Sequence, residues 1–118
     1  MNKDTPSTED EKSPEIFPSQ EEITSVFEKA LVGKQYKVLR IDTDESGKVT
    51  RFDIETEHNG GKAEYNYQTA TYDYRNESLP ASARYAASIH VVFYDKDGDY
   101  DGDDTLANYR DGEWSYTS

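Results

Sequence analysis

The sequence contains no cysteine and only two histidines among its 118 residues. The absence of cysteine excludes disulfide bonds, thiolate metal sites and cysteine nucleophiles, but it does not fix the cellular compartment. His58 stands beside Asn59 in a predicted turn and His90 stands alone in a predicted strand, so neither has the spacing of a zinc site. No serine lies in a G-x-S-x-G elbow, and there is no glycine-rich phosphate loop. We therefore expect a protein that is not an enzyme and has no catalytic residues.

Long apolar runs are also missing. No stretch approaches the length of a membrane span, and the printed N-terminus lacks the apolar region of a signal peptide. We expect a cytoplasmic protein without a membrane span. The alternative is an exported protein that is tethered through its N-terminal residues.

Positive charge is scarce, because 13 lysines and arginines face 25 acids and leave a formal net charge of −12. Direct binding of DNA or RNA needs a basic surface, so we do not expect it. The acids are concentrated in two places. Residues 1–22 hold seven acids and two lysines, residues 95–104 hold six acids and one lysine, and the rest of the chain is close to neutral. Such acidic segments favour a basic partner or a cation.

Apolar residues make up only 33% of the chain, so the hydrophobic core must be small, although ten tyrosines can contribute large buried areas. The length suits one domain. Residues 1–18 hold three of the four prolines and many polar residues, which predicts a flexible acidic tail. Residues 19–118 are predicted to form a single α+β domain.

The segment 19–33 predicts one N-terminal amphipathic helix. Ser19 and Glu22 have the spacing of a capping box, and Gly33 is a suitable stop. The apolar residues follow helical spacing and form one stripe, which we expect to face the core: Ile23, Val26, Phe27, Ala30 and Leu31.

After Gly33 the pattern predicts strands at 35–43, 49–57, 62–75, 84–95, 105–110 and 113–117, separated by turns with glycine. The segment 49–57 alternates, with Phe52, Ile54 and Thr56 on one face and Arg51, Asp53 and Glu55 on the other. In 62–75 the tyrosines change face, which predicts a bulge near 69–71. The expected fold is a helix packed on a curved antiparallel sheet of five or six strands in meander order.

The segment 95–105 is predicted to be an aspartate-rich loop between two strands. Asp97, Asp99, Asp101 and Gly102 match the D-x-D-x-D-G opening of a calcium loop, with Asp103 as a further ligand. The twelfth position is Asn108, where a bidentate glutamate is expected, and the preceding segment is not helical. If the loop binds Ca²⁺, we expect a dissociation constant of roughly 10⁻⁴ to 10⁻³ M. A solvated turn and a docking surface are the alternatives.

Tyrosine is favoured at protein interfaces, because it combines a large contact area with a polar tip. The sequence therefore favours a small acidic binding protein that engages a basic protein, as inhibitors, immunity proteins and anti-defence proteins that imitate nucleic-acid charge do. The alternative is a calcium-binding or envelope-tethered module. The oligomeric state stays open. The expected partner-binding residues are Asp95, Asp97, Asp99, Asp101, Asp103, Asp104, Tyr65, Tyr67, Tyr94 and Tyr100.

Overall fold

The structure, a computed structural model, describes residues 16–80 and 84–117. Most of the predicted flexible tail, residues 1–15, lies outside the described residues. The last part of that predicted tail contacts the domain, because Phe17 packs against the hydrophobic core and the Lys48 ammonium lies 4.0 Å from the centre of its ring.

The helix α1 spans Gln20–Leu31 and begins as predicted. The Ser19 hydroxyl accepts a hydrogen bond from the Glu22 backbone N–H (3.1 Å), and the Glu22 carboxylate accepts one from the Ser19 backbone N–H (2.7 Å). The helix ends before Gly33, because Val32 already has a left-handed backbone with φ of +50°. It is not at the N-terminus of the chain, since 19 residues precede it. Within the described residues, no helix is long and apolar enough to cross a membrane.

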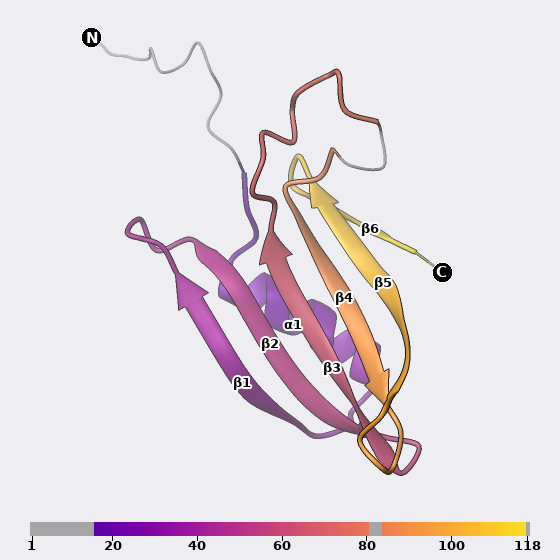
Figure 1. The fold of residues 1–118 in the computed structure, drawn as a ribbon. Helices are drawn as coiled ribbons and strands as arrows, with labels where there is room; N and C mark the ends of the chain where they lie inside the picture. Colours follow the sequence, from indigo (N-terminus) through magenta and orange to yellow (C-terminus); the bar gives the residue numbers. More distant parts are fainter. Residues whose placement is uncertain (1–15, 81–83, 118) are drawn as a thin grey trace, which may run out of the picture.

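Six antiparallel strands follow the helix in simple meander order, which confirms the α+β class. The strands are β1 (Tyr36–Thr43), β2 (Val49–His58), β3 (Gly61–Thr69), β4 (Ala87–Tyr94), β5 (Tyr100–Arg110) and β6 (Glu113–Tyr116). The sheet is open, and α1 lies across one of its faces (Figure 1). We call this the covered face, and the opposite one the open face.

The structure corrects two details of the predicted sheet. It curves only weakly, and the register shifts that would bend it are confined to the β1–β2 and β4–β5 pairs. The predicted long strand 62–75 ends at Thr69. The tyrosines change face because the strand ends there, and no bulge is involved. Tyr74 lies beyond the strand and is still buried in the core.

The core lies between α1 and the covered face. Ile23, Val26, Phe27 and Leu31 of α1 are buried, as their spacing predicts. Phe27 meets Phe52 of β2 edge to face, with ring centres 5.2 Å apart, and this arrangement is favourable for aromatic pairs. Burial of the apolar stripe of α1 against the sheet is therefore the main source of the domain's stability.

Candidate functional site

The acidic segment differs from the predicted loop, because it is a short turn followed by a strand. The turn covers residues 95–99, and β5 begins at Tyr100, directly opposite Tyr94. Pairing with β4 satisfies the backbone N–H and C=O groups of β5 regardless of its side chains. The strand can therefore include Asp101, Asp103 and Asp104. We call residues 94–104 the acidic tip. It lies beside the β2–β3 turn at one end of the sheet (Figure 1).

One aspartate of the acidic tip serves the turn itself. The Asp95 carboxylate accepts hydrogen bonds from the backbone N–H groups of Asp97 (2.9 Å) and Asp99 (3.0 Å). The Asp95 N–H donates to the Asp99 carbonyl at 2.8 Å, and the Gly98 N–H donates to the Asp95 carbonyl at 2.9 Å. Gly98 has φ of +86°, which a side chain rarely adopts. The Asp95 carboxylate therefore stabilises the turn and is less available to a partner than an unbonded carboxylate.

The other aspartates of the acidic tip are exposed. Among the described residues, the carboxylates of Asp97, Asp99 and Asp101 have neither a hydrogen bond nor an ion pair. Asp104 accepts only from the N–H of the next residue. Asp103 accepts from the hydroxyl of Tyr100. The acidic tip therefore presents several uncompensated negative charges to solvent, and these attract cationic groups.

The four expected interface tyrosines are divided between the two faces of the sheet. Tyr67 is fully buried in the core on the covered face, so it has no surface for a partner, and its burial raises the pKa of its hydroxyl. Its neighbour Tyr65 is half-buried and packs on Phe27, with ring centres 6.1 Å apart. Helix α1 covers that face, and sequence periodicity alone does not show which face it takes.

Tyr94 and Tyr100 lie together on the open face, at the acidic tip. Tyr94 is half-buried, with the Lys62 ammonium 5.6 Å from its ring centre. Tyr100 is 63% exposed, and the hydrogen bond to Asp103 raises the pKa of its hydroxyl. These two tyrosines are therefore the members of the expected set that can contact a partner beside the exposed carboxylates.

The predicted calcium ligands are divided between two elements. Asp97 and Asp99 lie in the turn, whereas Asp101 and Asp103 lie in β5. In residues 16–80 and 84–117, no three histidine, aspartate or glutamate side chains are grouped so that they could hold a metal ion. A calcium loop curls its carboxylates around the ion, and an extended strand does not.

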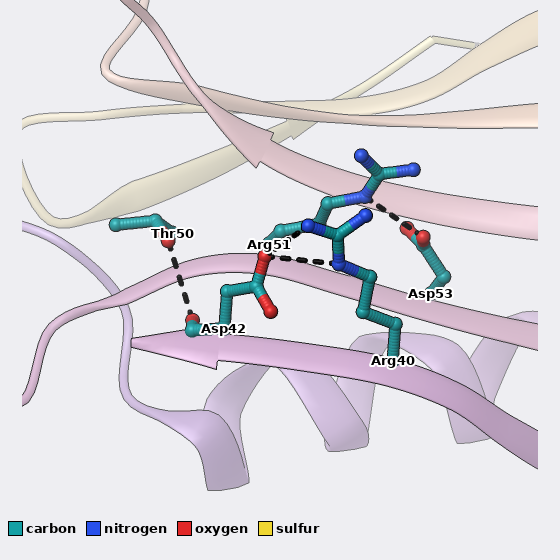
Figure 2. Close-up of polar contacts among 5 residues, drawn as sticks. All are labelled: Arg40, Asp42, Thr50, Arg51 and Asp53. Carbon is teal, nitrogen blue, oxygen red and sulfur yellow. Dashed lines mark hydrogen bonds and ion pairs between the residues drawn. The ribbon is translucent and has the colours of Figure 1, made fainter. Parts of the chain in front are cut away.

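A second charged cluster, which the sequence analysis missed, lies on the open face at β1 and β2 (Figure 2). Arg40 contacts Asp42 at 2.8 Å, and Arg51 contacts Asp53 at 2.8 Å. The register also pairs Arg40 with Asp53 and Asp42 with Arg51, so the charges alternate in both directions. The signal in the sequence is the spacing R-x-D, which occurs in both strands. This charge checkerboard is neutral as a whole, unlike the acidic tip.

Asp53 is the most buried member of the charge checkerboard, since its side chain is only 7% exposed. The alternation in 49–57 places Asp53 on the side of β2 opposite Phe52, Ile54 and Thr56. The side is correct, but the neighbouring side chains bury it. One of its two carboxylate oxygens has no hydrogen-bond partner among the described residues.

The two histidines stand apart from each other. His58 stacks on Phe93 with ring centres 4.7 Å apart, and His90 is exposed on the open face, near the Thr105 hydroxyl at 3.4 Å. Comparison of the chain with protein-family models, with curated proteins and with solved structures found no match. Function is therefore argued from the geometry of this chain alone.

Proposed function

We propose that this protein is a small, acidic, non-enzymatic binding protein whose acidic tip engages a basic surface of another protein. The observation that carries the proposal is the set of uncompensated carboxylates at Asp97, Asp99 and Asp101. They stand beside Tyr100, an exposed aromatic residue of the kind enriched at interfaces. By contrast, the charge checkerboard compensates its own charges and needs no outside partner.

Clustered like charges repel one another in the free protein, and a basic partner relieves that repulsion. The same charges steer diffusing partners, so association is fast at low ionic strength and weakens as salt is added. An inhibitor, an immunity protein or an anti-defence protein that imitates nucleic-acid charge would use its acids in this way, by occupying a site that evolved for phosphate groups.

The test is co-purification from the native source at about 0.1 M and about 1 M salt, where the Debye length falls from about 10 Å to about 3 Å. The wild-type protein is compared with a variant that carries Asp97→Asn, Asp99→Asn and Asp101→Asn. A control variant carries Glu21→Gln, Glu45→Gln and Glu77→Gln, which change the net charge equally at exposed sites away from the acidic tip.

We expect a partner that is retained at low salt by the wild type and the control, and is lost with the acidic-tip variant. The partner's dissociation constant for the wild type should rise steeply with salt. Retention by all three proteins, or no partner for the wild type at low salt, would contradict the proposal. Circular dichroism of the three proteins checks that the fold is unchanged.

The same unpaired carboxylates support the alternative, a calcium-binding or envelope-tethered module that uses residues 95–105. The D-x-D-x-D-G spacing is the observation that favours it. Isothermal titration with Ca²⁺ up to about 5 mM should then give a dissociation constant of roughly 10⁻⁴ to 10⁻³ M. Absence of both heat and a thermal shift would leave the basic protein partner as the occupant.

A further inference from the structure

The strand β1 exposes three apolar side chains. Val38 is 48% exposed, Leu39 is 42% exposed and Ile41 is 37% exposed, although the chain has few apolar residues. A chain with so few apolar residues needs them in its core. The exposure of three apolar side chains in one edge strand therefore requires a physical explanation. Their position suggests that another surface covers them.

The backbone of β1 points to a strand as that surface. β1 is the first strand of the sheet order, so in the part of the chain that the structure describes no strand pairs with its outer side. It is eight residues long and contains neither proline nor glycine. An edge of this kind presents a row of unpaired N–H and C=O groups, which is a template for pairing with another chain.

The opposite edge of the sheet is protected against pairing with a strand of another chain. β6 has only four residues and pairs with residues 107–110 of β5, so among the described residues no strand pairs with residues 100–104 on that side. These residues include Asp101, Asp103 and Asp104, and charge on an edge strand prevents pairing with other strands. The β1 edge is therefore the long and apolar one of the two.

The sequence of β1 is complementary to itself in one antiparallel register. A register shift in the pairing with β2 makes Leu39 an extra residue. As a result, Val38 and Ile41 both lie on the covered face, opposite Ile54 and Phe52, whereas Lys37 and Asp42 both lie on the open face. A two-fold axis between Leu39 and Arg40 then places Val38 opposite Ile41 of a second copy, Lys37 opposite its Asp42, and Leu39 opposite its Arg40.

The neighbouring registers do not fit. If the axis passes through Arg40, two arginines face each other and Val38 meets Asp42, and like charges opposite each other in a sheet are destabilising. If the axis passes through Leu39, Val38 meets Arg40 and Lys37 meets Ile41. An axis through Ile41 joins Arg40 to Asp42 but places Val38 opposite Asp44, so the register with its axis between Leu39 and Arg40 is the one of these four that pairs both Val38 and Ile41 with apolar residues and Lys37 with Asp42.

Other occupants fit this edge less well. Residues 1–15 contain no valine, isoleucine, leucine or aromatic residue, and they contain Pro6 and Pro14, which cannot donate ladder hydrogen bonds. The basic partner proposed above is also unsuited, because β1 itself carries Lys37 and Arg40 against one acid, Asp42. A second copy is the occupant with matching apolar surface and strand length, and it places the acid Asp42 opposite Lys37.

We infer that two copies of this chain pair through β1 in that register and form a two-fold symmetric dimer with one continuous sheet. Each contact then occurs twice, as in any isologous interface. The inference is independent of the proposed function, because the pairing uses residues 37–42 of β1 and none of the acidic tip, although Asp95, Lys96 and Gly98 of the tip line a surface cavity together with Tyr36 and Lys37.

The experiment is sedimentation equilibrium of the full chain over a wide concentration range, with circular dichroism to confirm that each variant is folded. We expect the wild type to dimerise. Lys37→Asp should weaken dimerisation about tenfold, because it faces Asp42 of the other copy twice. Combining Lys37→Asp with Asp42→Lys exchanges the two charges and should restore dimerisation.

The replacements Val38→Lys and Ile41→Lys together should give a monomer at every concentration. A wild type that stays monomeric at millimolar concentration would overturn the inference. So would a dimer that both Lys37→Asp and the double lysine variant leave unchanged. Failure of Lys37→Asp with Asp42→Lys to recover dimerisation would overturn the stated register.

Discussion

The turns at residues 44–48 and 95–99 have the same backbone but different charged residues: Asp44, Glu45 and Lys48 give a formal net charge of −1, whereas Asp95, Lys96, Asp97 and Asp99 give −2. In both, the first aspartate accepts hydrogen bonds from the N–H groups two and four residues later, at 2.9 to 3.0 Å. In both, the first N–H donates to the fifth carbonyl, and the fourth residue is a glycine with positive φ, +92° for Gly47 and +86° for Gly98.

The turns differ at their second, third and fifth positions, and Glu45 stands where the other turn has Lys96. Turn 44–48 has Ser46 and Lys48, whose ammonium lies 3.9 Å from the Asp44 carboxylate. Turn 95–99 has Asp97 and Asp99 at the same positions. One aspartate and one glycine are therefore sufficient for this turn, and the further acids of the acidic tip contribute nothing to its geometry.

The largest difference in stability between the two turns should appear on mutation of Gly61, because the backbone at turn 95–99 packs against this residue. A methyl group at Gly61 would overlap the backbone of Tyr94 and Asp95, whereas no such contact adjoins turn 44–48. We expect Gly61→Ala to lower the free energy of unfolding by about 1–3 kcal/mol, as over-packing does. Urea unfolding measures the change. Lys62→Ala, the next residue along β3, is the control, and an equal loss there would contradict the steric reason.

The next effect concerns the aspartate that forms each turn. Asp95→Ala removes the acceptor for two backbone N–H groups, and we expect a loss of about 1 kcal/mol in the free energy of unfolding. Asp44→Ala should act in the same direction. Asp97→Ala, which removes no hydrogen bond, should leave stability unchanged or slightly higher. If Asp97→Ala lowered the free energy of unfolding as much as Asp95→Ala, the conclusion that only the first aspartate stabilises each turn would be wrong.

A smaller effect should appear as a dependence on pH. The side-chain hydrogen bond from Ser46, followed by the backbone N–H of Lys48, lowers the pKa of Asp44. A pKa that is lower in the folded state gives stability that is present above the unfolded value of about 3.9 and is lost as pH falls through the folded pKa. The stability difference between wild type and Asp44→Asn should therefore vanish at acidic pH. A difference that stays constant down to acidic pH would contradict the linkage.

The smallest effect should come from exchanging the two turns' residues. Asp97→Ser together with Asp99→Lys gives turn 95–99 the third and fifth residues of turn 44–48. We expect a change within about 0.5 kcal/mol, because both positions are exposed. The sign should be stabilising at low salt, where repulsion between the acids is least screened, and should vanish at high salt. Thermal melts at two salt concentrations measure it, and a marked loss would show that the acids have a structural role.

Local patterns predicted the elements whose geometry is set by nearby residues. The capping box of Ser19 and Glu22 fixed the start of α1. The pairs Asn59-Gly60 and Asp111-Gly112 predicted two-residue hairpin turns, and all four residues have positive φ. Composition alone located the acidic segment.

Features that depend on tertiary pairing could not be predicted in this way. Aspartate and glycine disfavour strands, so nothing local indicated that β5 begins at Tyr100, before the last aspartates. Alternation places Tyr67 on a face, but only the position of α1 decides that this face is buried. Likewise, the spacing of the aspartates does not distinguish Asp95 from Asp97. The Asp95 carboxylate accepts two backbone hydrogen bonds in the turn, whereas the Asp97 carboxylate accepts none from the described residues.

The chain has a single tryptophan, Trp114 of β6, and its ring lies 4.9 Å from Tyr109 and 6.4 Å from Tyr67 between ring centres. Tyrosine transfers its excitation to a nearby indole, so the emission of Trp114 reports whether β6 is docked on the core. An emission change that precedes the loss of circular dichroism on heating would mean that unfolding starts at the C-terminal strand. Coincident changes would mean that the domain unfolds as one cooperative unit.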